Sequence, residues 1–186
     1  MKKLLFTIAI FSFFALKSNA QHADNRPVIA DSGKKIEGGI QWITWEQATE
    51  LNKTKPKKFM IDVYTEWCGW CKKMDREIFT DAAVAKFVAD NYYAVKLDAE
   101  QKADIIFNDH TFKFVAQGRN GFHEFAATLL DNNMGYPTIV YLSEKYERTV
   151  ISPGYKDAPT LIKELKFTAE EHYKKGTWDD YMSKGK

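Results

Sequence analysis

Residues 59–72 read FMIDVYTEWCGWCK, and this stretch decides the fold of the chain. Its first part, 59–64, is a short apolar run of strand length, which is typical of a strand buried on both faces. An acidic residue stands inside that run, where burial of a polar group needs a reason. A helical pattern follows the second cysteine. The sequence therefore predicts a buried strand leading directly into a helix, with two cysteines at the junction.

The two cysteines are Cys68 and Cys71. A cysteine at a helix N-terminus faces unpaired backbone amides and the positive end of the helix dipole, which both favour the thiolate. We therefore expect Cys68 to be the attacking nucleophile. Cys71 lies about one helical turn further on and can resolve the mixed disulfide that forms.

Two other interpretations of the cysteine pair stay open, a structural disulfide and half of a zinc site. A bridge between residues three apart closes almost no loop and would stabilise the fold little. The histidines are scattered and show no ligand spacing with the pair, so we expect no metal and no cofactor. They are His22, His110, His123 and His172.

The segment from Phe59 to Lys73 resembles the active-site region of the thioredoxin superfamily. The resemblance implies a role for Asp62, which stands where the family carries a buried aspartate that accepts a proton from the second cysteine. Burial would raise the pKa of this carboxyl and suit it to that task. Lys96 falls where the family carries a lysine that pairs with the aspartate. An ordinary lysine at a strand edge is the alternative for Lys96.

A second signature lies at residues 135–138, which read GYPT. The resemblance implies a cis peptide bond before Pro137, although a trans proline in a plain turn is commoner. It also implies that the backbone around Tyr136 binds an extended substrate chain by strand-like hydrogen bonds.

The residues around the nucleophile complete the expected substrate-binding surface. Trp67 and Trp70 flank Cys68 and would form an apolar collar for a protein substrate, with Gly69 between them. Burial under the helix is the alternative for Trp67. Trp70 stands where thioredoxin has proline, so the resemblance does not imply a direction of electron flow.

The fold that we expect is an α/β thioredoxin fold, a central mixed β-sheet flanked by helices, with a helical insertion before the cis-proline strand. Thr44 and Gln47 form a capping box that predicts a helix to about Asn52. Residues 100–133 form the expected insertion, whose phenylalanines would be the core of extra helices or a partner site. The other expected strands are 92–97, 138–142 and 148–151, and the other expected helices end near 78, 88 and 173.

The N-terminus predicts export. An apolar run from Leu4 to Leu16 follows two lysines, and small residues at Ser18 and Ala20 suit cleavage before Gln21. We expect a signal peptide rather than a membrane anchor, and hence a periplasmic protein. The expected organisation is a signal peptide at 1–20, a flexible tail at 21–40 and a thioredoxin-like domain at 41–186.

Charge argues against nucleic acid as a partner. The chain holds 27 basic and 25 acidic residues. Removal of the expected signal peptide takes away Lys2, Lys3 and Lys17 and leaves a nearly neutral protein. No basic excess remains for a phosphate backbone.

The resulting functional expectation is thiol-disulfide exchange with proteins of the cell envelope that contain disulfides or thiols, more as reductant than as oxidant. A reductant in an oxidising compartment needs a redox partner protein, such as a membrane electron relay. The alternatives are an oxidase or isomerase of the same chemistry, and a non-catalytic binding or chaperone module. We expect a monomer.

Overall fold

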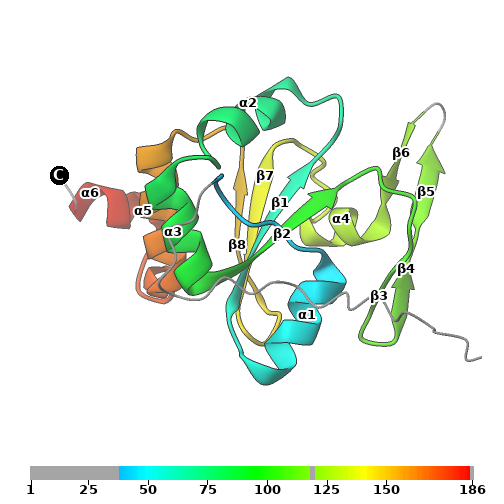
Figure 1. Cartoon of the computed structure of the whole chain (residues 1–186), viewed down its shortest axis with the longest axis horizontal. Helices are drawn as coiled ribbons and strands as arrows, with labels where there is room; N and C mark the ends of the chain where they lie inside the picture. The colour runs from blue at the N-terminus through cyan, green and yellow to red at the C-terminus, as the bar shows by residue number, and fades with distance from the viewer. Residues whose placement is uncertain (1–37, 118–119, 185–186) are drawn as a thin grey trace, which may run out of the picture.

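The computed structural model describes residues 38–117 and 120–184 (Figure 1). The expected signal peptide and most of the expected tail lie outside these residues. Gly39 and Ile40 are buried, and the Ile40 amide donates a 2.8 Å hydrogen bond to the carbonyl of Phe79, so the packed part of the chain already includes them. No helix within 38–117 or 120–184 is long and apolar enough to cross a membrane.

A four-stranded mixed sheet forms the centre of the fold, with the strand order β2-β1-β7-β8. Strand β1 (Lys58–Tyr64) is parallel to β2 (Tyr92–Asp98) and antiparallel to β7 (Thr138–Leu142). Strand β8 (Arg148–Pro153) pairs antiparallel with β7. The ends of β1, β2 and β8 therefore meet the start of β7 at one edge of the sheet. This edge carries the cysteine motif.

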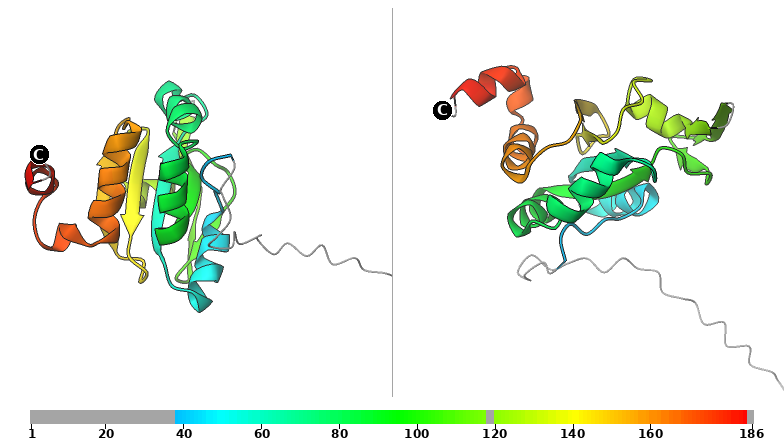
Figure 2. Two further views of the ribbon diagram at one scale, coloured as in Figure 1. Left: turned by 60° about the vertical axis from the view of Figure 1, so that its left-hand side comes forward. Right: turned by 90° about the horizontal axis from the view of Figure 1, so that it is seen from above.

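Helices cover both faces of the sheet, as expected for an α/β sandwich (Figure 2). Helix α1 (Trp45–Thr54) covers one face and begins with the predicted capping box. Helices α2 (Gly69–Glu77), α3 (Ala82–Asn91) and α5 (Ala158–Ala169) supply buried side chains to the cluster on the other face. The parallel pairing of β1 with β2 needs a crossover, which α2 and α3 provide.

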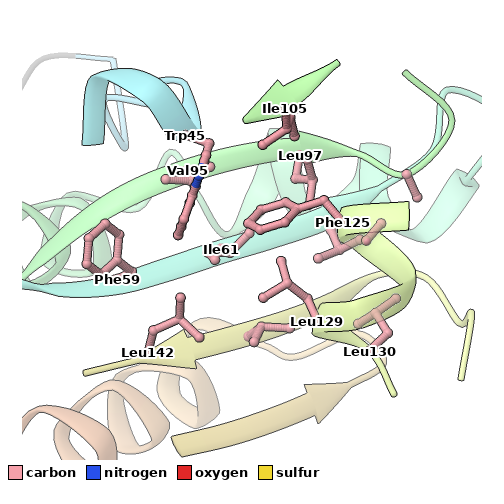
Figure 3. Close-up of a cluster of buried hydrophobic side chains, with 14 of the residues drawn as sticks. Trp45, Phe59, Ile61, Val95, Leu97, Ile105, Phe125, Leu129, Leu130 and Leu142 are labelled. Atoms are coloured by element: carbon pink, nitrogen blue, oxygen red, sulfur yellow. The ribbon is translucent and has the colours of Figure 1, made fainter. Parts of the chain in front are cut away.

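Side chains of β1 alternate between the two faces. Phe59, Ile61 and Val63 enter the cluster that contains Trp45, which Figure 3 shows. Met60 enters the cluster on the opposite face, against α2 and α3. Asp62 follows the same alternation as Met60. The single acid of this strand is therefore aimed at the helix that carries the cysteines.

The expected helical insertion at 100–133 is wrong. Strands β3 (Ile105–Phe107) and β4 (His110–Phe112) form one hairpin, and β5 (Phe114–Gln117) and β6 (Asn120–His123) form another. Among the described residues of this segment, only α4 (Glu124–Leu129) is helical.

Turn chemistry explains this error. Asn108 and Asp109 connect β3 to β4 with positive φ angles of 50° and 61°. Two such residues form the tight turn that matches the twist of a hairpin, and Asn and Asp tolerate this conformation. Apolar residues in three-residue strands mimic helical spacing over so short a distance.

Aromatic contacts attach the hairpin region to the main core. The ring centroids of Phe107 and Trp45 are 5.0 Å apart, and those of Phe112 and Phe125 are 5.1 Å apart. Phe125 lies on α4 and is buried beside Trp45 (Figure 3). The insertion therefore extends the cluster on the α1 face of the sheet.

The C-terminal segment differs from its prediction in length. Helix α5 ends at Ala169, and a short 3-10 turn η1 (His172–Lys174) and helix α6 (Trp178–Lys184) follow. Trp178 and Tyr181 pack against the ring of Phe167, at centroid distances of 5.4 and 5.2 Å. Trp178 therefore packs against α5.

The outer edge of β2 is partly covered. Ile43 forms a parallel bridge with Val95, and its amide donates a 2.9 Å hydrogen bond to the carbonyl of Ala94. Gly39 enters this segment with a φ of +90°, and a Cβ there would collide with the carbonyl of Phe79. Glycine is required at this position for both reasons.

Candidate active site

The cysteine pair lies at the start of α2, as the sequence predicted. Cys68 is the N-cap residue of α2, and the Cys71 amide donates a 3.0 Å hydrogen bond to its Sγ atom. The two sulfurs form a disulfide. The exposed fraction is 5% for Cys68 and 1% for Cys71, so Cys68 is the more accessible of the two. Amides that point at the Cys68 sulfur stabilise a thiolate there.

Asp62 lies fully buried on the face of β1 that α2 covers. Its Oδ2 atom accepts a 2.6 Å hydrogen bond from Nζ of Lys96, while Oδ1 has no hydrogen-bond partner among the described residues. Burial raises the pKa of Asp62, and the charge of Lys96 acts in the opposite direction. The carboxyl is thus more basic than usual and still held beside a cation.

Strand register brings Asp62 and Lys96 together, because they are direct partners in the β1–β2 ladder. The Lys96 ammonium also binds the carboxylate of Asp75, which lies on α2. Three aromatic rings surround it, with centroids 4.8 to 5.2 Å from Nζ; they belong to Trp42, Tyr64 and Phe79. Lys96 is therefore a bridge between β1 and the cysteine helix, and not an isolated edge lysine.

The cis peptide bond between Tyr136 and Pro137 is confirmed. Pro137 precedes Thr138, the partner of Val63 in β1, so it lies at the sheet edge that carries the cysteines. The Gly154 amide donates a 2.8 Å hydrogen bond to the carbonyl of Pro137. The loop after β8 therefore holds the proline segment in place.

Both tryptophans of the motif project into solvent. Trp67 is 66% exposed and Trp70 is 57% exposed, so the burial of Trp67 that the sequence left open is wrong. Gly69 between them is exposed, and a Cβ there would meet nothing within 4 Å. Side chains on either side of the cysteines are thus available for contact with another molecule.

Sequence reasoning missed Asp75. It lies four residues after Cys71 on α2, one turn further along the same face. That spacing was the available signal, because a side chain one turn beyond a buried cysteine can reach the same polar group. Its partner Lys96 lies on β2, so the contact itself depends on the tertiary fold.

Sequence reasoning also missed two other buried polar side chains, Lys156 and Glu164. Nζ of Lys156 donates hydrogen bonds to three carbonyls, of Ser152 at 3.0 Å, Pro153 at 3.2 Å and Gly154 at 2.8 Å. Burial lowers the pKa of Lys156, and its charge acts to lower the pKa of Asp62. Nothing in a loop lysine signals this role.

Glu164 accepts hydrogen bonds from Oη of Tyr141 at 2.8 Å and Oγ of Ser152 at 2.6 Å. It lies on the buried stripe of α5, between Leu161 and Leu165. A glutamate in a buried helical stripe was the available signal, since such a group needs partners. Both groups stabilise the strand and loop that hold Pro137.

The histidines occupy ordinary structural positions. His123 is buried, and its Nδ1 atom accepts a hydrogen bond from the Phe125 amide at the start of α4. The ring of His110 meets the ring of Phe112 edge-on, and His22 lies outside the described residues. Over 38–117 and 120–184, no three His, Cys, Asp or Glu side chains are grouped to hold a metal ion.

Comparison with protein families shows which family this chain belongs to. The family model described as "Thioredox_DsbH: Protein of unknown function, DUF255" matches residues 32–169, most of the chain. The chain belongs to the Thioredox_DsbH family. The match covers the cysteine motif, the Asp62–Lys96 pair and Pro137, so the site lies in the part of the chain that defines the family.

Other relatives of this Thioredox_DsbH chain are longer proteins. It is 31% identical over 84 residues to "Uncharacterized protein B0495.5" of Caenorhabditis elegans, a match that covers 45% of the chain and 12% of the relative. It is 28% identical over 99 residues to the thiol:disulfide interchange protein DsbD of Actinobacillus pleuropneumoniae, covering 53% of the chain and 14% of DsbD. The chain thus matches about an eighth to a seventh of these relatives.

Solved structures confirm the thioredoxin fold. A structure described as "DsbH Oxidoreductase" superimposes with a TM-score of 0.51 at 17% identity, over 82% of this chain and 95% of the other. A thioredoxin from Thermus thermophilus superimposes with a TM-score of 0.52 at 16% identity, over 70% and 87% of the two chains. The resemblance of residues 59–73 to the thioredoxin superfamily is therefore confirmed for the family and the fold.

Proposed function

We propose that this protein is a thiol-disulfide oxidoreductase that exchanges the Cys68/Cys71 pair with protein disulfides of the cell envelope, working as the reductant. The observation that carries the proposal is a disulfide at the N-terminus of α2 with the buried carboxyl of Asp62 on the adjacent strand. A disulfide that served only to stabilise the chain would need neither a buried acid nor its lysine partner.

The catalytic cycle starts from the reduced pair. The Cys68 thiolate attacks one sulfur of a substrate disulfide, forms a mixed disulfide and releases the other substrate sulfur as a thiolate. Asp62 then accepts the proton of the Cys71 thiol. The Cys71 thiolate attacks Sγ of Cys68, which leaves the Cys68–Cys71 disulfide and expels the second substrate thiolate. Two electrons pass from the pair to the substrate.

Asp62 and Lys96 have complementary parts in this cycle. Burial makes the Asp62 carboxylate a stronger base than an exposed one, which favours proton transfer from a thiol. The Lys96 ammonium at 2.6 Å keeps the carboxyl ionised, so that it can accept the proton. Asp75 holds the same ammonium from α2 and is a positioning residue.

The substrate would lie across the exposed tryptophans and the proline segment. Trp67, Gly69 and Trp70 line the approach to Cys68, and the backbone around Tyr136 and Pro137 offers strand-like hydrogen bonds. Electrons return to the oxidised pair from a second protein, which we propose to be a membrane electron relay. Residues 1–20 have the pattern of a signal peptide, which supports a periplasmic location.

The deciding experiment is the reduction potential of the pair in purified protein. Equilibration in glutathione and dithiothreitol buffers, with quantification of free thiols, gives the potential directly. A value near or below about −250 mV supports the reductant. A value above about −180 mV would instead indicate an oxidase or isomerase of the same chemistry.

Trapping tests whether the cysteines exchange with other proteins at all. Cys71→Ser should accumulate mixed disulfides on Cys68 in envelope extracts, because the resolving thiol is missing. Cys68→Ser is the matched control and should trap nothing. Absence of trapped species in both variants would favour a binding module with a structural disulfide.

A further inference from the structure

Two aromatic pairs flank the disulfide. The rings of Trp67 and Tyr136 contact each other at a centroid distance of 5.8 Å, and those of Trp70 and Tyr155 at 5.3 Å. Within 38–117 and 120–184, the only other large hydrophobic side chain that is clearly exposed is Ile106, in the hairpin region. Exposed apolar surface outside the hairpins is thus concentrated around the dithiol, which marks a contact surface.

The sheet order sets the two pairs apart. Glu100, which contacts Trp67, follows the end of β2, whereas Tyr155, which contacts Trp70, follows the end of β8. Strands β2 and β8 are the two outer strands of the sheet, and β1 and β7 lie between them. The cysteine motif follows β1, so the disulfide lies between an end near β2 and an end near β8.

The end near β2 is acidic. Glu66, Asp98 and Glu100 form this acidic end, and Nε1 of Trp67 donates a 3.1 Å hydrogen bond to Glu100. Burial raises the pKa of Asp98, and the charges of Glu66 and Glu100 add to this rise, while the hydrogen bond from the Glu100 amide and the charge of Lys102 act against it. The pKa of Tyr136 rises to about 12 through burial and the charges of Glu100 and Asp98. Three carboxylates thus act on one small region beside Trp67.

The end near β8 is basic. Lys73, two residues after the second cysteine, forms this basic end. Nζ of Lys73 lies 5.4 Å from the ring centroid of Trp70 and 5.2 Å from that of Tyr155. Glu77 is 3.8 Å away on the next turn of α2, a long and half-exposed ion pair that neutralises Lys73 weakly.

We propose that the substrate segment carries hydrophobic side chains beside its cysteine, with basic residues on one side and acidic residues on the other. Its basic side would lie at Glu66, Asp98 and Glu100, and its acidic side at Lys73. Because strand-like hydrogen bonds at Tyr136 would hold the segment in one chain direction, one charge order along the segment fits both ends and the reverse order fits neither. This inference rests on the proposed function, because it names the substrate class of that same site.

The test uses two peptides of identical composition, each with a central cysteine in a mixed disulfide with glutathione. One has lysines before and glutamates after an apolar-Cys-apolar core, and the other has the reverse order. Reduction by the dithiol form of the protein is followed by chromatography under single-turnover conditions. We expect one charge order to react about three- to tenfold faster at low salt, and this preference to shrink in 0.5 M NaCl, because exposed ion pairs are weak and screened.

Charge exchange provides the matched variants. In Glu100→Lys with Lys73→Glu, the preference for one order of charges should be lost, because Glu66 and Asp98 keep the end near β2 negative while the end near β8 becomes negative too. The control exchanges Lys86 and Asp90, an exposed ion pair on α3, and should keep the wild-type preference. A melting temperature for each variant reports whether it is folded.

The outcomes separate this inference from the proposed function. Equal rates for both peptides at low salt would overturn the charge polarity while leaving the oxidoreductase intact. The same conclusion follows if the double exchange is folded and active but keeps the wild-type order. Failure to reduce either peptide, together with failure to reduce a small disulfide such as oxidised glutathione, would overturn both.

Discussion

The dithiol edge of the central sheet and the hairpin region from β3 to β6 are built in opposite ways. Strands β1 and β7 are buried along almost their whole length, and the register of β1 with β2 fixes Asp62 opposite Lys96. The hairpin strands have three or four residues each, are partly exposed, and pair only within their own hairpin. Chemistry that needs fixed distances is therefore expected on the first region, while the second can change without disturbing it.

The largest expected difference between the two regions concerns the nucleophile. Cys68→Ser should lower the rate of disulfide exchange by more than about a thousandfold, because a hydroxyl cannot replace the thiolate. Thr111→Ala, in strand β4 of the hairpin region, is the matched change and should keep the rate within about twofold. Insulin reduction measures both. A Cys68→Ser protein with substantial activity would contradict the assignment of the site.

The next effect tests the buried carboxyl. Asp62→Asn should slow exchange about ten- to hundredfold, because Cys71 loses its proton acceptor while the nucleophile remains. The loss should be largest in the resolution of the mixed disulfide. Glu124→Gln, in α4 of the insertion, removes a carboxylate elsewhere and should have no such effect. Stopped-flow kinetics of mixed-disulfide decay separate the two steps.

The same variant, Asp62→Asn, should lose activity but gain stability at neutral pH. The pKa of Asp62 is raised in the folded state, so the folded protein binds a proton more tightly than the unfolded chain. Stability therefore falls as pH rises from about 3.8, the ordinary value, through the raised pKa. At pH 7 Asp62→Asn should be more stable than wild type, by on the order of 1 kcal/mol, and the gain should vanish in acid. Urea unfolding at several pH values measures it, and a less stable variant at pH 7 would show that the Lys96 pair outweighs burial.

A change in the hairpin region tests whether that region influences the dithiol. A Cβ at Gly121 would collide with the ring of Phe114 and the carbonyl of Val115, so Gly121→Ala should destabilise the protein by about 1–3 kcal/mol. The reduction potential should stay within about 10 mV of wild type, less than half of a tenfold change in the equilibrium constant. Gly135→Ala is the control for stability, since a Cβ there meets nothing within 4 Å. A large shift in potential for Gly121→Ala would show that the two regions are coupled.

The smallest expected effect concerns Lys156, which binds carbonyls at the end of β8 and in the loop that follows. Lys156→Met removes a charge that lowers the pKa of Asp62, so the pH dependence of mixed-disulfide resolution should move to higher pH. Lys163→Met, on the exposed side of α5, is the matched control and should leave the pH profile unchanged. An identical profile in both variants would limit Lys156 to holding the carbonyls of the loop.

The sequence predicted the parts of the molecule where local pattern and function coincide. The apolar run of β1, the capping box at Thr44 and Gln47, and the motif at Cys68 each lie within a few consecutive residues. The pairing of Asp62 with Lys96 and the cis bond before Pro137 came from the family resemblance, and the structure places them as expected.

The remaining features depend on contacts between distant elements. Asp75 takes its partner from β2, so its neighbours in sequence do not mark it. Lys156 binds carbonyls only two to four residues before it, and its burial is the feature that the local sequence does not show. The hairpins were missed because their strands have only three or four residues, about one period of a helix, and helical and strand patterns cannot be told apart over that length. The positive φ angles at Asn108 and Asp109 decide the first hairpin, and Asn-Asp is a weaker turn signal than Asn-Gly.

The short bridge between Ile43 and Val95 has a consequence for colloidal behaviour. An outer strand with free amides and carbonyls is a template on which another copy of a protein can build, and fibrils grow from such strands. Here the segment around Ile43 occupies part of the β2 border, while the opposite border, β8, starts with Arg148 and ends with Pro153. Charge and proline are both devices that discourage such growth. Loss of the segment before α1 would therefore show first as a shorter shelf life in concentrated solution.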